Sequence, residues 1–361
     1  MKGTADIIFR TVSEKKVYAM NELEASEHKR VSVISPTYNG KKYLDNFLHS
    51  ILDQTYNNIE FIIIDDGSSD GSSELLQNYR NLFSARGYSF TYIRQSHAGQ
   101  AVAINNGLKK FSGDFLMWID SDDMLEKECI AKMVTLLENS PEAGFAVSDS
   151  RYVQFGVKEE GYIFGRYVDA GRDDYFFDLL RGKHNYSLGC GTALVRREVL
   201  CDAIPDLHIF ESPEGQNLQL MLPITYHSRC VYLHEPLHIR VVHADSHCHK
   251  ERSYKEEIIR QYNFVDLIRE TISKMHIPEE KAAVEIAEKR FAHRILALAY
   301  ANRDMREFFK QSAYLRFVKD FSPDEKSELA AVKTLHFGKL SRIMYRWKNK
   351  RLMKKKDGIC S

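Results

Sequence analysis

The sequence predicts an α/β protein, built on an open sheet whose strands alternate with helices along the chain. Two observations lead to this fold class. Between residues 31 and 150, short apolar runs rich in β-branched residues alternate with segments whose apolar residues recur at helical spacing. The loops after these runs are rich in Asn, Asp, Gly and Ser, which form turns and helix N-caps. In open α/β sheets, ligands bind at the carboxyl ends of the strands.

The first three pairs of strand and helix are expected before residue 112. A β-branched strand starts at Val31 and is expected to end at Pro36, because proline cannot donate to a central ladder. A second strand is expected at residues 59–64, where 61–64 form a continuous apolar run, as expected of a parallel strand buried on both faces. A third strand is expected at residues 90–95. The three helices are expected at residues 41–54, 72–79 and 101–111.

The fourth and fifth strands are expected at residues 115–120 and 144–150, with a helix over 124–139 between them. The pattern is less regular from residue 151 to 250. It indicates a strand or hairpin at 161–168, a short helix at 176–182, a strand leading into a helix at 191–203, and one or two strands at 230–243. Two long amphipathic helices are expected further on, at residues 256–275 and 280–301.

Composition excludes several classes of protein. The chain of 361 residues is 43% hydrophobic, which fits a globular protein. It contains no apolar run of the roughly 18 residues that span a bilayer, and its first 30 residues are too charged for a secretory signal. The six cysteines are Cys129, Cys190, Cys201, Cys230, Cys248 and Cys360. Because they form no C-x-x-C pair, we expect reduced thiols, no structural disulfide and a cytoplasmic location.

The basic character of the chain belongs to its tail. Residues 339–356 carry nine Lys or Arg and no acid, which leaves a net charge of −8 on the rest of a chain whose total is +1. Leu340, Ile343, Met344 and Trp347 recur there at helical spacing, a pattern typical of a basic helix on an anionic membrane surface. A solvated helix end is the alternative. Nucleic acid is not an expected partner, because no nucleic-acid-binding motif accompanies the charge.

Three loops at the predicted carboxyl ends of strands carry unusual residues. They are SPTYNG at residues 35–40, DDGSSDGS at 65–72 and DSDDM at 120–124. Any one of them alone is typical of a solvent-facing turn. Because neighbouring parallel strands end at the same edge of a sheet, the three loops together predict a binding site at that edge.

The last of these loops places Asp120, Asp122 and Asp123 directly behind an apolar strand. Carboxylates packed this closely disfavour one another's ionisation unless a cation lies between them. An EF-hand is excluded, because the sixth and twelfth positions of its loop require Gly and Glu and are Leu125 and Ala131 here. A haloacid-dehalogenase-like phosphatase with Asp120 as nucleophile stays an alternative, although its D-x-D normally follows the first strand.

Two long segments resemble the nucleotide-sugar half of a family 2 glycosyltransferase with the GT-A fold. They are SVISPTYNGKKYLDNFLHSILDQTYNNIEFIIIDDGSSDGS and QSHAGQAVAINNGLKKFSGDFLMWIDSDDMLEKE. The resemblance is close from residue 31 to 150 and thins toward residue 245. It implies the open, mixed, Rossmann-like sheet of nucleotide-diphospho-sugar transferases, with a C-terminal helical extension. The regions we expect are a lead-in (1–30), a GT-A domain (31–250) with a nucleotide-sugar half (31–150) and an acceptor half (151–250), a helical region (251–338) and a basic tail (339–361).

The resemblance implies roles for individual residues of the nucleotide site. Pro36, Tyr38 and Asn39 fall on the loop that contacts the nucleotide, where Tyr38 stacks on the base. Asp66 falls on the acid that hydrogen-bonds the uracil or the ribose. Asn105 and Ser121 are further nucleotide-binding candidates. Where the family often has A-R-N, this chain has A-I-N ending at Asn105, so a basic contact to the diphosphate is missing or comes from elsewhere, with Arg94 and Lys109 as candidates.

The resemblance also implies a metal site for Mn²⁺ or Mg²⁺. Asp120 and Asp122 fall on the D-x-D pair, with Asp122 the more direct ligand, and Asp123 follows them. His243, in an R-x-x-H segment, falls where related enzymes supply a histidine near the metal and the diphosphate. A buried structural histidine is the alternative for His243. A zinc site in the His-rich run 243–249 is not expected, because one dense run cannot wrap the four ligands of zinc.

The acceptor half departs from the family pattern. Family members carry an E-D pair whose Asp deprotonates the acceptor hydroxyl, and this chain has Gln216 and Asn217 there. An amide cannot act as a general base. Glu214 and Glu211 are the nearby acids, and we prefer Glu214 as the candidate base. The alternative is that both are surface acids of a loop.

These inferences lead to one functional expectation. The resemblance implies a metal-dependent, inverting glycosyltransferase of the hexosyl or N-acetylhexosaminyl type. It would move a sugar from a nucleotide donor, UDP-linked, to a glycan or lipid-linked acceptor in surface polysaccharide synthesis, at the inner face of the cell membrane. The alternatives are a phosphohydrolase that uses Asp120 and a non-catalytic nucleotide-sugar binder. No motif encodes the sugar, the acceptor or the linkage.

Overall fold

A computed structural model of the chain describes residues 29–156, 161–164, 175–182, 188–243 and 251–320. Nearly all of the predicted lead-in, the whole basic tail and the predicted domain boundary near residue 250 lie outside these ranges. None of the described helices is long and apolar enough to cross a bilayer.

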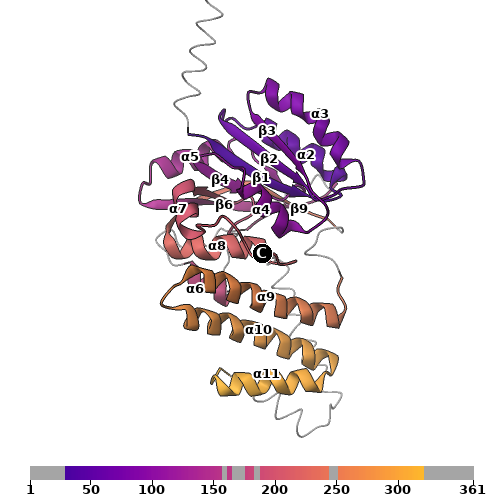
Figure 1. The fold of residues 1–361 in the computed structure, drawn as a ribbon, viewed down its shortest axis with the longest axis vertical. Coiled ribbons are helices and arrows are strands. Elements are labelled where there is room, and N and C mark those ends of the chain that lie inside the picture. The colour runs from indigo at the N-terminus through magenta and orange to yellow at the C-terminus, as the bar shows by residue number, and fades with distance from the viewer. Residues whose placement is uncertain (1–28, 157–160, 165–174, 183–187, 244–250, 321–361) are drawn as a thin grey trace, which may run out of the picture.

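The described strands form one mixed sheet in the order β3-β2-β1-β4-β8-β6-β9-β5, with β7 beside β6 (Figure 1). Its strands are β1 (Val31–Thr37), β2 (Ile59–Asp65), β3 (Ser89–Arg94), β4 (Phe115–Trp118), β5 (Met124–Leu125), β6 (Ala143–Gln154), β7 (Tyr162–Phe164), β8 (Ala193–Arg196) and β9 (Arg229–Val242). β1 pairs in parallel with β2 and β4, and β2 with β3. The carboxyl ends of these four strands therefore lie at one edge of the sheet. β8 runs antiparallel to β4 and to β6, so the predicted open, mixed sheet is confirmed.

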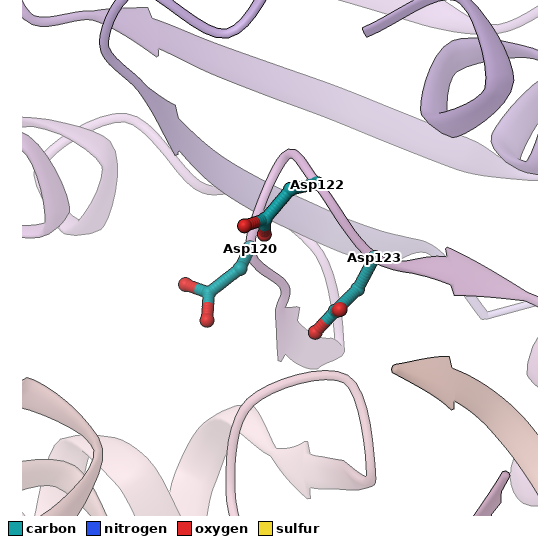
Figure 2. Close-up of side chains that lie close together, drawn as sticks. All are labelled: Asp120, Asp122 and Asp123. Atoms are coloured by element: carbon teal, nitrogen blue, oxygen red, sulfur yellow. The ribbon is translucent and has the colours of Figure 1, made fainter. Parts of the chain in front are cut away.

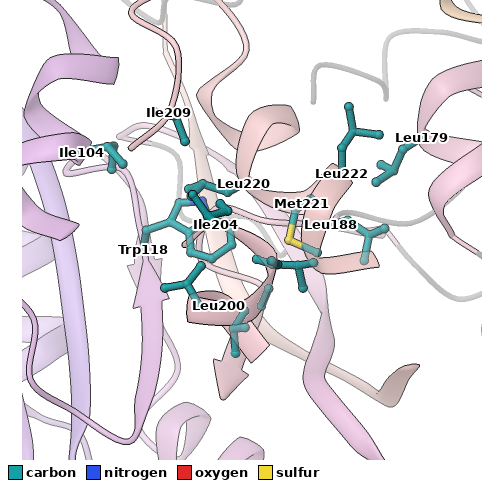
Figure 3. Close-up of a cluster of buried hydrophobic side chains, with 14 of the residues drawn as sticks. Ile104, Trp118, Leu179, Leu188, Leu200, Ile204, Ile209, Leu220, Met221 and Leu222 are labelled. Atoms are coloured by element: carbon teal, nitrogen blue, oxygen red, sulfur yellow. The ribbon is translucent and has the colours of Figure 1, made fainter. Parts of the chain in front are cut away.

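Helices cover both faces of the sheet. They are α2 (Lys41–Leu52), α3 (Ser72–Ala85), α4 (Gln100–Leu108), α5 (Cys129–Glu138), α6 (Phe176–Arg181), α7 (Arg197–Ala203) and α8 (Gln216–His227). Alternate residues of β1 enter two different cores, because side chains alternate across a strand. Val33 packs in a core with α2, α3 and α5, while Ile34 packs in a core with α4, α7 and α8. Figure 3 shows part of the second core, which includes Trp118 of β4 and Ile204.

Three further helices are stacked one after another beyond α8, away from the sheet (Figure 1). They are α9 (Tyr254–Met275), α10 (Glu280–Asn302) and α11 (Met305–Phe317). α9 starts at a capping box in which Ser253 and Glu256 satisfy each other's backbone N–H groups. Ile268 of α9 and Phe291 of α10 belong to the same core as Trp118. The predicted C-terminal helical extension is therefore present and adds side chains to the core of the sheet.

The structure corrects the predicted end of the first strand. β1 continues through Pro36 to Thr37, with Pro36 in register with Ile64 of β2. β4 pairs with β1 only as far as Ile34, opposite Trp118. At Pro36, β1 therefore has no paired strand on the β4 side. The missing N–H of proline costs no ladder hydrogen bond there.

A second correction concerns the predicted helix over residues 124–139. Met124 and Leu125 instead form β5, because they pair with Ile239 and His238 of β9. The helix that follows, α5, starts at Cys129. This short strand joins the acidic loop after β4 directly to β9.

Candidate active site

The loops after β1 and β2 are bonded together at the carboxyl edge of the sheet. The backbone N–H of Asp66 donates to Thr37 O at 2.8 Å. Asn39 Oδ1 accepts from Ser69 N at 2.8 Å, and Asn39 N donates to Ser68 Oγ at 2.9 Å. Asn39 has a φ of 49°, in the left-handed region that Asn tolerates better than most residues. Two of the three predicted loops therefore form one surface.

Asp66 anchors the next loop, residues 95–99, which leads into α4. Its carboxylate is 3% exposed. Oδ1 accepts from Gln95 Nε2 at 2.7 Å and from Ala98 N at 2.8 Å, and Oδ2 accepts from Gly99 N at 2.9 Å. His97 Nδ1 lies 2.9 Å from the same Oδ2. Asp66 thus fixes the start of α4, and its contact with a nucleotide stays a prediction.

Tyr38 presents an exposed aromatic ring beside Asp66. Its side chain is 49% exposed, and its ring stacks on that of His97 with centroids 4.0 Å apart. Pro36 lies buried in β1, two residues before it. An exposed flat ring beside a buried carboxylate is suited to a nucleobase, which offers both a π face and hydrogen-bonding edges.

The turn after β4 gathers three carboxylates. Ligand oxygens of Asp120, Asp122 and Asp123 all lie within 4.8 Å of one another (Figure 2). Burial, and then the negative charges of Asp122 and Asp123, raise the pKa of Asp120 to about 6, while Arg240 acts in the opposite direction. This carboxyl group is therefore strained when ionised, and a cation would relieve the strain.

The first two carboxylates each contact a side chain from another part of the fold. Asp120 Oδ1 accepts from Gln100 Nε2 at 2.7 Å, and its backbone N–H donates to Cys190 Sγ at 3.0 Å. Asp122 Oδ2 lies 2.8 Å from His243 Nε2. The structure therefore brings together the three predicted metal ligands Asp120, Asp122 and His243 at one site.

Asp123 is held differently from the other two. Its Oδ1 accepts from Val241 N at 2.9 Å, and its Oδ2 lies 3.1 Å from His238 Nε2. His238 Nδ1 in turn lies 2.9 Å from Ser150 Oγ. The ring also packs against Gly191, where an added Cβ would come within 2.3 Å of it. Asp123 therefore fastens the acidic turn to β9.

His243 is held by packing. Its side chain is buried and stacks on Tyr43 of α2 with ring centroids 4.1 Å apart. Its Nδ1 finds no hydrogen-bond partner within the described ranges. The ring is thus positioned by Tyr43 on one side and by Asp122 at Nε2.

The residues present fit a hard divalent cation. Asp120 and Asp122 offer carboxylate oxygens, the ligands that Mg²⁺ and Mn²⁺ prefer, and His243 adds an imidazole nitrogen. The raised pKa of Asp120 indicates that these groups are not neutralised by the cationic side chains around them. We place Asp123 outside the ligand set, because both of its oxygens already accept from groups of β9.

The two remaining nucleotide-binding candidates lie in different surroundings. Ser121 is half-buried beside Gly40, in the acidic turn. Asn105 is buried, and its amide donates to Ile209 O at 3.0 Å and accepts from Ile209 N at 2.9 Å. Its Nδ2 also lies 3.2 Å from His208 Nε2. Asn105 therefore ties α4 to the loop before α8, and its predicted nucleotide contact stays a prediction.

The acceptor half has an amide at the position of the expected acid. Asn217 lies in the first turn of α8, and its Oδ1 accepts from Trp118 Nε1 at 2.6 Å. This bond directs the amide oxygen of Asn217 toward the indole. The other polar group of its side chain, the NH₂, is a hydrogen-bond donor. Glu214 is 8% exposed and accepts from Arg260 Nε at 3.0 Å, whereas Glu211 is exposed and lies 3.7 Å from His208.

Sequence reasoning missed several residues of this site. Gln100, Cys190 and His238 contact the acidic turn from elements that lie up to 115 positions away in the chain. Their positions carry no local signal, because the contacts depend on the order of strands in the sheet. His97 lies in the segment QSHAGQ, residues 95–100, which is part of the family resemblance. Its place between Tyr38 and Asp66 follows because these loops come after neighbouring parallel strands.

The protein has the GT-A fold. This fold is defined here by the open, mixed sheet, by the loops at its carboxyl edge and by the acidic turn after β4. Residues 32–202, just under half of the chain, match the family model described as glycosyl transferase family 2, which confirms the predicted resemblance. The chain is 32% identical over 168 residues to TuaG of Bacillus subtilis, whose name connects it with teichuronic acid biosynthesis. It is 35% identical over 135 residues to glycosyltransferase GlyA of Streptococcus pneumoniae.

These matches cover parts of each chain. The match to TuaG covers 46% of this chain and 62% of TuaG, and that to GlyA covers 37% and 18%. The chain therefore spans less than two thirds of either relative. Among solved structures, S. aureus TarS 1-349 in complex with UDP-GlcNAc has a TM-score of 0.58 at 17% identity, covering 78% of this chain and 79% of that chain. Mannosyltransferase PcManGT from Pyrobaculum calidifontis, in complex with GDP-Man and Mn²⁺, has a TM-score of 0.51 at 17% identity, covering 94% and 93%. Both confirm the GT-A fold.

Proposed function

We propose that the protein is a metal-dependent, inverting glycosyltransferase that moves a sugar from a UDP-linked donor to a glycan or lipid-linked acceptor in surface polysaccharide synthesis. The observation that carries the proposal is the meeting of Tyr38, Asp66 and the acidic turn at one edge of the sheet. The nucleotide sugars bound by TarS and PcManGT, and the name of TuaG, support the donor class and the pathway.

The chain's own groups would bind and orient the donor. Tyr38 would stack on the base, and Asp66 would accept from the base or the ribose. Asp120, Asp122 and His243 would hold Mn²⁺ or Mg²⁺. When bound, the cation would act as a Lewis acid for the charge that develops on the departing diphosphate. Gln100 would keep the Asp120 carboxylate in place through its bond to Oδ1.

Acceptor activation is the second part of the proposal. A single in-line displacement by an acceptor oxygen would invert the anomeric centre. Glu214 is our candidate for the base that takes the proton, because the amide of Asn217 cannot do so. Arg260 would keep the Glu214 carboxylate charged and would orient it through the bond to Oε2.

We further propose that the protein works at the inner face of the cell membrane. The support is the basic, amphipathic sequence of residues 339–356, which lies outside the described residues. Deleting residues 339–361 would then remove binding to vesicles that contain anionic lipid while leaving UDP binding intact.

The first experiment is calorimetry of UDP binding with and without Mn²⁺. The native chain is compared with Asp122→Ala and with Asp53→Ala, an exposed aspartate at the end of α2. We expect Mn²⁺-dependent binding that Asp122→Ala loses by at least ~100-fold and Asp53→Ala retains. If no nucleoside diphosphate binds the native chain, the proposal is wrong.

A non-catalytic nucleotide-sugar binder is the second candidate, and one observation favours it. Asn217 replaces the expected acid and is bonded to Trp118. A binder would show the same metal-dependent UDP affinity but no release of UDP from UDP-sugars, with or without added glycan or lipid-linked acceptors. Turnover of any donor would exclude it.

A further inference from the structure

One side chain in the nucleotide site already makes the contacts expected of a ligand. The His97 ring stacks on Tyr38 at a centroid distance of 4.0 Å and an interplanar angle of 19°. Its Nδ1 lies 2.9 Å from Asp66 Oδ2 and forms a hydrogen bond with the backbone oxygen of Asp66 at 3.2 Å. A ring stacked on Tyr38, with a ring nitrogen beside the Asp66 carboxylate, is the arrangement that the proposed function assigns to the base of the donor. The imidazole is a flat heterocycle with a ring N–H, as uracil is.

His97 lies against the last open position of the Asp66 carboxylate. A carboxylate accepts about four hydrogen bonds, and three donors already bond to that of Asp66, while His97 Nδ1 lies 2.9 Å from Oδ2. Two of them are the backbone N–H groups of Ala98 and Gly99, which start α4. The third, the amide of Gln95, is also held by its own contact with Asn106. His97 is the group that can be exchanged, because its side chain is 56% exposed.

The backbone around His97 is fixed, so the exchange requires only a side-chain rotation. Gln95 N donates to Asp65 O at 2.9 Å. Gly67, with a φ of +79°, packs so closely under the loop that an added Cβ would lie 2.9 Å from His97 N. An exposed side chain changes rotamer on the picosecond to nanosecond scale, without any movement of the loop.

We propose that His97 occupies the nucleobase position in the unliganded protein and must rotate away before the donor binds. This inference rests on the proposed nucleotide function and deepens it. Since the imidazole imitates a ring N–H beside a π face, the position selects bases that carry a ring N–H, which uracil and guanine have and cytosine and adenine lack. The apparent affinity for the nucleotide is lowered by the fraction of protein in which His97 is in place.

The test is UDP binding to His97→Ala in the presence of Mn²⁺, measured by calorimetry on the full chain. Removing the competing ring is expected to tighten UDP binding by roughly 3- to 30-fold. Ser96→Ala, a change at the exposed neighbouring residue, is the matched control and should leave the affinity unchanged. His97→Phe keeps a ring for Tyr38 but cannot donate to Asp66, so its affinity should lie between those of the native chain and His97→Ala. The native chain should bind UDP or GDP more tightly than CDP or ADP.

The possible results separate this inference from the proposed function. Tighter binding by His97→Ala supports it, since a loss of structure could only weaken binding. Unchanged or weaker binding by His97→Ala, with normal binding by the native chain, overturns it and leaves the donor site intact. Failure of the native chain to bind any of the four nucleoside diphosphates overturns both.

Discussion

At the scale of single residues, the ionised carboxyl group of Asp120 destabilises the folded protein. Burial first, and then the charges of Asp122 and Asp123, raise its pKa from 3.8 to about 6. A carboxyl group whose pKa is raised by folding binds its proton more tightly in the folded state. The free energy of unfolding therefore falls as the pH rises from about 4 to about 6, and the full cost is present above that range.

Asp120→Asn is therefore expected to stabilise the metal-free protein. The amide can still accept from Gln100 but carries no charge. The gain should be about 2 kcal/mol at neutral pH and should vanish near pH 4, where Asp120 itself is protonated. Urea unfolding in EDTA at the two pH values measures it.

The matched control for this prediction is Asp53→Asn, an exposed aspartate that should change stability at neither pH. An Asp120→Asn protein that is less stable than the native chain at neutral pH would contradict the argument. If Asp120→Asn is more stable but loses Mn²⁺-dependent UDP binding, the charge at Asp120 costs stability and is needed for function.

At the scale of elements, the acceptor half depends on the contact between the loop before α8 and α9. Glu214 accepts from Arg260 at 3.0 Å, and both side chains are largely buried. Glu214→Gln is expected to lower the free energy of unfolding by about 1–2 kcal/mol, because the buried arginine loses this charged partner. Arg260→Gln removes the same pair from the other side and is the matched variant.

Turnover distinguishes a base from a positioning residue at Glu214. As a base, Glu214→Gln should reduce the release of UDP from the donor by at least ~100-fold, well beyond the loss in Arg260→Gln. Equal losses in the two variants would contradict the role of base, and Glu214 would then only fasten the loop to α9.

The elements that could be predicted are those with a clear period. The continuous apolar run of β2 and the helical spacing in α2, α9 and α10 predicted the correct type of structure. α8 could not be predicted in this way, because residues 220–225 are all buried and a helix that is apolar all round has no amphipathic period. Pro223 within it also lowers its helix propensity. α11 lies within the helical region predicted over residues 251–338, although its bounds were not predicted.

The site could be predicted to the extent that it comes from neighbouring loops. Asp66 and Asp120 follow strands that flank β1, so their proximity follows from strand order alone. His238 and Gln100 could not be predicted, because their contacts depend on the antiparallel return of the chain through β9 and on the angle at which α4 starts. The resemblance placed Asp123 directly after the predicted metal ligands. In the structure its carboxylate is occupied by contacts with Val241 and His238 of β9.

At the scale of the whole molecule, the core does not end where the predicted domain ends. Val265, Leu267, Ile268 and Ile272 of α9 lie in the same buried cluster as Trp118 of β4. α10 joins this cluster through a face that includes buried alanines and phenylalanine. α11, by contrast, packs on the far end of α10 in a separate small cluster. The three C-terminal helices should therefore differ in how much the sheet depends on them.

Truncation tests this difference. A chain that ends at Ser253 loses α9, α10 and α11 and exposes the apolar side of α8, so it is expected not to fold cooperatively. A chain that ends at Arg303 loses α11 alone among the described helices, with the buried side chains of Phe308 and Leu315, and is expected to fold with a lower melting temperature. Circular dichroism during heating measures both. Cooperative melting of the shorter chain at the native temperature would contradict the shared core and would support an independent GT-A domain over residues 31–250.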